Sequence, residues 1–356
     1  MKVSELAYDL PPELIAQHPA PQRDASRLLV LHRDTGRIEH RTFRDLSAYL
    51  RPGDCLVLND TRVLPARFFA ERSTGGRVEA LFLSEEGGDW HVLLKPAGRQ
   101  RPGEWLGCPG DPVRLQLVER GPRGAWRVRP EPPTPAAAFL ARVGHPPLPP
   151  YIRRTSDPAP GSDALDAERY QTVYAAHGGA IAAPTAGLHF TQSLLDQLAA
   201  GGVRRATLTL HVGIGTFTPV EVEDLADHRM HPEWYAVPAD SLRALDQARR
   251  DRGRVVAVGT TAVRVLETLG RLGQVLGAGG VGDSAAAVSG WTEIFIYPPY
   301  RFVNVDALVT NFHLPGSTLL ALVMALAGRD LILSAYEAAI AERYRFYSYG
   351  DAMLIL

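Results

Sequence analysis

Cysteine and lysine are scarce in this chain of 356 residues, and each scarcity excludes a class of protein. Cys55 and Cys108 are the only cysteines and they form no CxxC pair, so neither a disulfide framework nor a cysteine zinc site can be built. Lys2 and Lys95 are the only lysines, and the formal net charge is −1, which excludes a uniformly basic coat for nucleic acid. An apolar content of 46% is nevertheless enough for a large buried core.

Long hydrophobic runs are also missing. The longest apolar run, residues 318–327, is far shorter than the roughly 20 residues that cross a bilayer. The N-terminal stretch MKVSELAYDLPPELI carries acidic residues where a secretory signal would be apolar. We therefore expect a soluble, cytoplasmic protein.

The middle of the chain differs from both flanks in net charge and in the pattern of its apolar residues. Residues 62–154 carry a net charge of +6, against −1 for residues 1–61 and −6 for residues 155–356. The middle block consists of short, partly alternating β-type runs between Gly- or Pro-containing turns, a pattern typical of a small antiparallel barrel. We therefore predict an inserted antiparallel β-barrel domain at residues 63–152. Its positive charge fits a phosphate-backbone contact and equally fits an ordinary solvated barrel.

The flanks, residues 1–62 and 153–356, are predicted to form one discontinuous α/β domain. Buried strand patterns alternate there with polar loops and helical patterns, which indicates a largely parallel sheet flanked by helices. The strands are DCLVLND, GAIAA, RRATLTLHV, RVVAV and DALVTNF, and the helices are SLLDQLAA, AVRVLETLG and TLLALVMALAG. Ligands of such sheets bind outside the carboxyl ends of the strands, where the polar loops of this chain fall.

Three standard ligand motifs are absent. No GxxxxGKS/T phosphate loop occurs, and Gly213 and Gly215 begin a GxGxxG pattern whose third position is Thr218. The run from His228 to Glu233 holds two imidazoles and a carboxylate, but HExxH is missing. We therefore expect neither a Rossmann dinucleotide site nor a bound metal.

The loops after the predicted strands carry residues suited to chemistry on a ligand. Histidine can move a proton near neutral pH, glycine lets the backbone approach a ligand, and a helix N-terminus attracts an anion. The candidates for proton transfer are His189, His211, His313 and Asp60; those for binding a cofactor are Gly213, Gly215, Phe217, Thr260, Thr261, Arg264, Phe190 and Phe312; and those for a larger substrate are Arg62, Arg153, Arg154, His228, His231, Glu233 and Asn311.

Each candidate also has a purely structural interpretation. A histidine in an α/β protein is usually hydrogen-bonded within the fold, and Gly-Thr-Thr can simply cap a helix. The phenylalanines can fill the core, and Asp60 can hold Arg62 or a turn. Several such loops at one sheet edge favour a site, but the pattern alone does not choose a reaction.

Eight strings along the whole chain are more specific than these patterns. They are LNDTRV, RYQTVYA, APTAGLHFT, LHVGIGTFTPV, HRMHPE, VGTTAVRVLE, TNFHLPGSTLL and YRFYSYGDAML. Together and in this order they resemble the S-adenosylmethionine:tRNA ribosyltransferase-isomerase family of queuosine synthesis. The resemblance implies an α/β domain with an inserted β-barrel, in a cytoplasmic and commonly monomeric enzyme. The chain departs from that pattern at Pro299, where we expect glycine, and at Val303, where we expect lysine. It also carries a long insertion at residues 270–290.

The resemblance also implies a reaction. The family transfers and isomerises the ribosyl group of S-adenosylmethionine onto 7-aminomethyl-7-deazaguanine at the tRNA wobble position. Epoxyqueuosine forms while adenine and methionine leave, so S-adenosylmethionine is a co-substrate and no metal or other cofactor is needed. A base must remove a proton beside the sulfonium, and an acid would assist the departure of adenine.

On this chemistry we expect S-adenosylmethionine to place its carboxylate at the helix that starts near Thr261, with Arg264 as a further contact. Arg153 and Arg154 are expected to grip tRNA phosphates. Two other functions stay open: an RNA methyltransferase, although its Gly-rich loop is incomplete here, and a non-catalytic RNA-binding protein. Free adenine, S-adenosylhomocysteine or neither product distinguishes the three.

Overall fold

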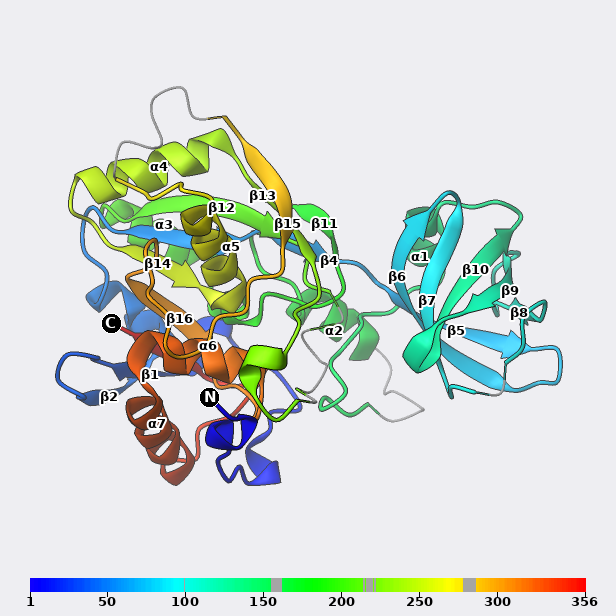
Figure 1. Cartoon of the computed structure of the whole chain (residues 1–356), viewed down its shortest axis with the longest axis horizontal. Coiled ribbons are helices and arrows are strands. Elements are labelled where there is room, and N and C mark those ends of the chain that lie inside the picture. Colours follow the sequence, from blue (N-terminus) through cyan, green and yellow to red (C-terminus); the bar gives the residue numbers. More distant parts are fainter. Residues whose placement is uncertain (99, 155–161, 214, 216–219, 221, 278–285) are drawn as a thin grey trace.

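A sheet and a barrel, which lie side by side in Figure 1, contain most of the strands. The computed structural model describes residues 1–98, 100–154, 162–213, 215, 220, 222–277 and 286–356. The sheet has nine strands, and the barrel is closed with six. The predicted fold class, α/β with an inserted antiparallel β-barrel, is confirmed.

The nine strands of the sheet follow the order β15-β13-β12-β3-β14-β16-β17-β1-β2. Their bounds are β1 Arg27–Leu31, β2 Ile38–Thr42, β3 Cys55–Asn59, β12 Arg204–Leu210, β13 Glu233–Val237, β14 Val255–Val258, β15 Val288–Thr292, β16 Ala307–Asn311 and β17 Ala352–Ile355. The four central strands β12, β3, β14 and β16 run parallel. The sheet as a whole is mixed, because β17 runs antiparallel to β16, and β2, β13 and β15 are antiparallel to their neighbours.

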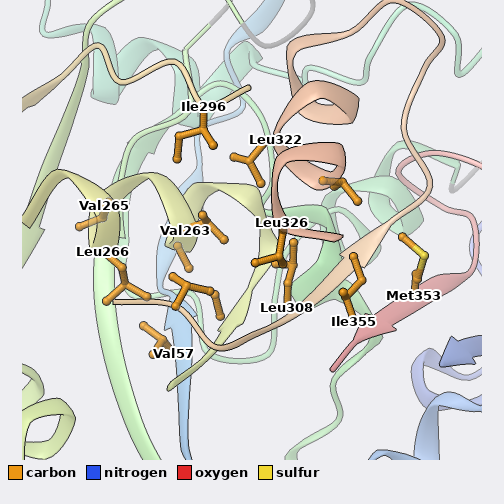
Figure 2. Packing of buried hydrophobic residues seen from close by; sticks show 14 of the residues in the cluster. Val57, Val263, Val265, Leu266, Ile296, Leu308, Leu322, Leu326, Met353 and Ile355 are labelled. Carbon is orange, nitrogen blue, oxygen red and sulfur yellow. The ribbon is translucent and has the colours of Figure 1, made fainter. Parts of the chain in front are cut away.

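Helices cover both faces of the sheet. They are α3 Gln192–Ala200, α4 Ala239–Arg250, α5 Gly259–Arg271, α6 Thr318–Ala327 and α7 Arg329–Ala341. Alternate residues of β3 point to opposite faces: Val57 packs with α4 to α7, whereas Leu56 and Leu58 pack with α3. Figure 2 shows the first of these layers, where Val57 and Leu308 from the sheet meet Val263 and Leu326 from the helices. Burying each such side chain contributes about 1.5–3 kcal/mol.

Short 3-10 helices connect many of these elements. They are η1 Val3–Leu6, η2 Pro12–Leu14, η3 Arg23–Ala25, η4 Phe43–Ala48, η5 Pro122–Gly124, η6 Thr185–His189 and η8 Leu225–Asp227. Within the described residues no single helix is long and apolar enough to cross a membrane. Only α6 and α7 taken together reach that length and hydropathy, and they are bent by 112° relative to each other.

The barrel has its own core. Its strands are β5 Arg67–Arg72, β6 Arg77–Glu86, β7 Asp89–Lys95, β8 Trp105–Gly107, β9 Arg114–Arg120 and β10 Ala125–Glu131. Along β6, Val78, Ala80 and Phe82 are buried while the residues between them are more exposed, as the predicted alternation requires. Helix α1, Ala136–Val143, packs against the barrel through Phe139, whose ring lies 5.0 Å from that of Trp90.

Two short parallel strands lie where the chain passes between sheet and barrel. Strand β4, Thr61–Val63, pairs with β11, His177–Ala180. Helix α2, Ser162–Arg169, lies in the same region of Figure 1. The barrel strands and α1 all lie within residues 63–152, and we keep those bounds as a proposal for the inserted domain.

Candidate active site

The carboxyl ends of the four parallel strands meet at one edge of the sheet. Asp60 follows β3, His211 follows β12, Gly259 follows β14, and His313 comes shortly after β16. Because β17 is antiparallel to β16 and β1 is parallel to β17, the starts of β17 and β1 lie at this same edge. The edge is therefore rich in loop residues from distant parts of the sequence.

A cavity opens at this edge over the ends of β14 and β16. Of the candidate residues, its lining brings together Thr260, Thr261, Asn311, Phe312 and His313. His189 and His211 lie outside it, in two neighbouring hollows. The three candidate histidines thus occupy three separate positions along the edge.

The turn from β14 into α5 forms one wall of the cavity. Gly259 adopts φ +84°, a left-handed conformation that favours glycine, and α5 begins at this residue. No side chain caps the helix, so the N–H groups of its first turn have no partner within it. The hydroxyl of Thr261 is buried and has no partner among the described residues. This wall can therefore donate hydrogen bonds to an anionic group.

His313 is held from several sides at the cavity. Its Nε2 lies 2.8 Å from the hydroxyl of Thr310, its backbone N–H donates to Tyr336, and its carbonyl accepts from the hydroxyl of Tyr8. Burial lowers the pKa of His313 to about 3, so the ring is neutral at pH 7. Among the described residues Nδ1 has no partner, which leaves one ring nitrogen for a ligand or a proton.

His189 is enclosed instead of facing the cavity. Its Nδ1 lies 2.8 Å from the hydroxyl of Ser26 and its Nε2 lies 3.2 Å from Nδ2 of Asn311. The ring stacks on Phe43 with centroids 5.0 Å apart, and burial lowers the pKa of His189 to about 4. Both ring nitrogens are therefore engaged within the protein, which differs from the expected role in proton transfer.

His211 lies in a more open cleft beside β12 and β13. Its Nδ1 is 2.8 Å from the hydroxyl of Thr61, and its ring stacks on Trp234 with centroids 5.2 Å apart. Gly179, at φ +155°, leaves room for the ring, because a Cβ there would lie 2.6 Å from Nε2. Burial, and then the neighbouring His177, lower the pKa of His211.

Asp60 is buried beside this cleft. Its Oδ1 accepts a hydrogen bond of 2.7 Å from the hydroxyl of Thr209, and its Oδ2 lies 3.9 Å from Nε2 of His177. The negative charge of Asp60 favours protonation of His211 and opposes the lowering of its pKa by burial. Asp60 therefore lies near both His177 and His211, while Thr61 holds the His211 ring.

Glu233 and Arg264 neutralise each other in the interior. The guanidinium of Arg264 contacts Glu233 directly, and its Nε donates to the carbonyl of Ile294 over 3.3 Å. Glu233 also accepts from the backbone N–H of Gly213 over 2.8 Å. Both side chains are thereby occupied, so the structure corrects the expectation that Arg264 faces a cofactor carboxylate and that Glu233 positions a substrate.

His231 lies beside Gly215, and His228 lies near His231. A Cβ on Gly215 would lie 2.7 Å from the ring of His231, and His228 packs edge-on against Phe295 with centroids 5.1 Å apart. Burial and the neighbouring His231 lower the pKa of His228. His231 itself is exposed and can reach a substrate.

The three candidate phenylalanines have different positions. Phe190 is fully buried in the core layer that contains α3, with its ring edge-on to that of Phe43, so it is a core residue and not a cofactor contact. Phe312 lines the cavity but also packs against Phe346 with centroids 4.9 Å apart. Phe217 lies outside the described residues.

The candidate arginines differ in whether their side chains are free to contact a ligand. Arg154 makes two 2.8 Å hydrogen bonds to the buried carboxylate of Asp166 and a third to the carbonyl of Gln17, so its fork is already occupied and is not available to a phosphate. Arg153 is exposed, and its side chain has no partner among the described residues. Arg62 is exposed as well and donates to the carbonyl of Ala175.

Sequence reasoning missed several residues of the edge. Thr310, Tyr347 and Ser348 line the cavity, and Ser26 holds His189. Tyr347 has φ +71°, a conformation rare outside glycine, which no sequence pattern signals. The string HGGA, which carries His177, was the one available signal beside His211.

Metal-binding side chains do not gather at this edge. Over the described part of the chain, no group of three or more His, Cys, Asp or Glu residues has the geometry to hold an ion.

Comparison with known proteins assigns the family. The family described as "Queuosine biosynthesis protein" matches residues 3–355. The chain belongs to this family. The S-adenosylmethionine:tRNA ribosyltransferase-isomerases of Symbiobacterium thermophilum and Rubrobacter xylanophilus are 53% and 52% identical to it over the whole chain, covering 100% and 98% of those proteins. The crystal structure of the S-adenosylmethionine tRNA ribosyltransferase of Thermotoga maritima is 40% identical over 99% of this chain and 100% of that chain, with a TM-score of 0.56.

Two departures from the expected pattern of this queuosine biosynthesis family lie beside α5. The backbone N–H of Val303 donates to the buried carboxylate of Glu267, and the hydroxyl of Tyr300 does the same over 3.1 Å. A Cβ on Gly270 would lie 2.3 Å from Val303, so this side chain packs closely on the helix. Pro299 lies just before this segment, and of the long insertion residues 278–285 lie outside the described part.

Proposed function

We propose that this queuosine biosynthesis protein transfers and isomerises the ribosyl group of S-adenosylmethionine onto 7-aminomethyl-7-deazaguanine at the wobble position of tRNA. The products are epoxyqueuosine in tRNA, adenine and methionine. The family match across residues 3–355, with relatives of about half identical sequence over the whole chain, carries this proposal. The cavity at the carboxyl ends of the parallel strands supports it, because small ligands bind there in this class of fold.

The two other functions are not supported. An RNA methyltransferase and a non-catalytic RNA-binding protein would both leave the full-length match to ribosyltransferase-isomerases without explanation. The buried polar groups without partners around the cavity also favour a ligand site over a purely structural edge.

The reaction requires a base beside the sulfonium, and His313 is our first candidate. A base must be unprotonated before it accepts a proton, and the buried ring of His313 is neutral at pH 7, although burial also weakens it as a base. Its free Nδ1 and its fixed ring suit this role. Once the proton is removed, adenine leaves, the aminomethyl group of the modified base attacks, and a ribose hydroxyl displaces methionine to close the epoxide.

His211, with Asp60 as its orienting carboxylate, is our candidate for the proton that assists the departure of adenine. The charge of Asp60 favours the imidazolium form that an acid requires and opposes burial and His177, which together lower the pKa of His211. His211 and His313 follow β12 and β16, which are three strand spacings or about 14 Å apart. Val212 lines the cavity, so the cavity extends to the residue next to His211.

For S-adenosylmethionine, we propose that Thr260 and Thr261 at the start of α5 bind its carboxylate, with Phe312, Gly213 and Gly215 near the rest of the molecule. For tRNA, we propose that Arg62, Arg153 and His231 contact the nucleic acid and that the basic barrel, residues 63–152, adds to the grip. All three of these side chains are exposed. We further propose a monomer that acts in the cytoplasm with S-adenosylmethionine as co-substrate and no metal.

Product analysis tests the proposed function. The protein is incubated with S-adenosylmethionine and with tRNA that carries 7-aminomethyl-7-deazaguanine, and small molecules are separated by liquid chromatography. Free adenine and methionine in equal amounts are expected. S-adenosylhomocysteine would instead identify a methyltransferase, and the absence of any product together with tRNA binding would identify a non-catalytic binder.

A further inference from the structure

The amide of Asn311 has its orientation fixed by its neighbours. Its Nδ2 lies 3.1 Å from the carbonyl oxygen of Tyr347, and that oxygen can only accept a hydrogen bond. The same carbonyl also accepts from the backbone N–H of Gly350 over 2.9 Å, which holds it in place. The NH2 group of Asn311 must therefore face Tyr347, and Oδ1 must face the other way.

A chain of hydrogen bonds with a single direction continues from this amide. The second hydrogen of Asn311 Nδ2 points to His189 Nε2 at 3.2 Å, so this nitrogen must be the unprotonated one. Nδ1 of His189 then carries the proton and donates to the hydroxyl of Ser26 over 2.8 Å. Ser26 donates in turn to the carbonyl of Arg23 over 3.2 Å. The low pKa of His189 keeps this neutral form throughout the physiological range.

This arrangement leaves Oδ1 of Asn311, a hydrogen-bond acceptor, without a donor. Asn311 is only 2% exposed, lines the cavity, and its Oδ1 has no partner among the described residues. An unsatisfied buried carbonyl costs stability unless a ligand supplies the donor. The neighbouring strand ends in the first turn of α5, where the hydroxyl of Thr261 also lacks a partner. One wall can therefore donate hydrogen bonds and the adjacent wall can accept one.

We propose that Oδ1 of Asn311 accepts a hydrogen bond from the α-ammonium group of S-adenosylmethionine, and that His189 is a positioning residue that holds this amide. The inference rests on the proposed function, since it takes S-adenosylmethionine as the ligand of the cavity. An amino acid carries its carboxylate and its ammonium on one carbon. Donors at the start of α5 and an acceptor on the adjacent strand match that pair of groups.

This assignment separates His189 from proton transfer. A general acid or base must exchange a proton with the substrate, whereas both nitrogens of His189 are occupied by Ser26 and Asn311. Its contribution is to accept from one hydrogen of Asn311 and so to fix Oδ1 on the opposite side of the amide. A side chain that accepts at the position of Nε2 can replace it.

Steady-state kinetics on four variants test the proposal. We expect Asn311→Ala to raise KM for S-adenosylmethionine by about 10- to 100-fold, as for a lost bond to a charged group, with a smaller change in kcat. His189→Phe keeps the ring but not the acceptor and should raise KM in the same way. His189→Gln offers an oxygen near the position of Nε2 and should stay within about threefold of the wild type. Leu194→Ala, which truncates a buried apolar side chain of α3 that takes no part in these hydrogen bonds, should lower thermal stability and leave KM unchanged.

Two results would overturn the role of His189. A fall in kcat of about 10²–10⁴-fold in His189→Gln, with KM unchanged, would assign proton transfer to this ring. A rise in KM in Leu194→Ala equal to that in His189→Phe would mean that KM reports only a loosened fold.

A competitor that lacks the amino-acid part identifies the group bound by Asn311. 5′-Methylthioadenosine should inhibit the wild type and Asn311→Ala with the same inhibition constant, because it has no α-ammonium. If its affinity falls in Asn311→Ala as far as that of S-adenosylmethionine, the donor belongs to the adenosine part and our assignment is wrong.

Calorimetric titration with S-adenosylmethionine separates this inference from the proposed function. If the wild type releases no adenine, the function fails, but weaker binding by Asn311→Ala than by His189→Gln still supports the contact. Equal affinities of these two variants and the wild type would overturn it. A wild type that neither binds S-adenosylmethionine nor turns it over would overturn both.

Discussion

Both the barrel and the sheet domain bury polar atoms without partners, but they lie in different surroundings. In the barrel, Trp90 and Trp126 bury such atoms in a packed core and several surface charges are paired, whereas Thr261 and Asn311 line the cavity at the sheet. Arg127 and Arg129 both bind Asp89, and Arg142 binds Asp111. At the cavity, Thr261 and Asn311 each bury a polar oxygen that nothing in the described structure satisfies. Surface ion pairs contribute little to stability, while unsatisfied buried groups are costly and persist where a ligand completes them. The difference indicates that a ligand can supply the missing hydrogen bonds at the cavity, whereas the unpartnered atoms of the barrel core are enclosed by packed side chains.

The largest expected effect lies at the cavity. His313→Ala and His313→Gln should lower kcat about 10²–10⁴-fold, because each removes the proposed base. His91→Gln, a change of a partly exposed histidine on β7 of the barrel, is the matched control and should leave the rate unchanged. Adenine release under saturating substrates measures all three. Near-normal turnover in both His313 variants would move the base to another residue, with Asp60 next in line.

A smaller effect is expected where the two regions join. Arg154→Ala leaves the carboxylate of Asp166 buried without its partner, so we expect the free energy of unfolding to fall by about 3–5 kcal/mol. Urea denaturation measures it. Arg129→Ala on the barrel surface is the control and should cost much less, since its side chain is more than half exposed and Arg127 still pairs with Asp89. Equal losses would erase the distinction between buried and surface pairs.

Acidification should weaken the sheet edge through its buried histidines. The unfolded chain binds protons at the ordinary histidine pKa of about 6.5, whereas burial lowers the pKa of His189 to about 4 and of His313 to about 3. Stability is therefore complete above pH 6.5 and falls as the pH drops through 6.5 toward those values. At pH 5 each histidine should cost about 2 kcal/mol relative to pH 7.

Urea titrations at pH 7 and pH 5 check this dependence on pH. The double variant His189→Gln, His313→Gln should lose less stability on acidification than the wild type, even if it is less stable at pH 7. An unchanged difference between the two pH values would show that these rings do not control the acid response.

The smallest expected effect concerns Arg153. If this exposed guanidinium contacts one tRNA phosphate, Arg153→Ala should reduce the slope of log affinity against log salt by about one unit. Filter binding with tRNA at several salt concentrations measures the slope. Arg250→Ala, in helix α4 of the sheet domain, provides an arginine control that should leave the slope unchanged. An identical slope in Arg153→Ala and the wild type would remove Arg153 from the interface.

Local patterns predicted much of this fold. The continuous apolar runs of β3, β12, β14 and β16 are strong signals because these strands are buried on both faces. The alternating runs of the barrel are strong signals because these strands are buried on one face. The edge strand β2 and the three-residue β8 escaped notice, since IEHRT and WLG are too polar or too short to signal a strand. The position of β17 depends on contacts with β16 and β1 that no local pattern records.

The site was less accessible to sequence reasoning than the fold. The strings around Thr260, Asn311 and His313 predicted residues that do line the cavity. Sequence could not show that Arg264 is neutralised by Glu233 or that His189 is enclosed, because these contacts join residues 31 and 122 positions apart. Pairing and burial decide which member of a suggestive string faces a ligand, and both are properties of the assembled chain.

The position of β17 sets an order of events during synthesis on the ribosome. This strand lies between β16 and β1, in the interior of the sheet, although it is made after every other strand. The segment just before it, with Tyr347 and Ser348, supplies part of the cavity wall. The barrel is complete by residue 131 and its core by residue 143, so it can fold while translation continues. The sheet, by contrast, cannot be completed until residues 352–355 emerge. A nascent chain that stalls before Tyr347 therefore has a folded barrel but lacks part of the cavity wall.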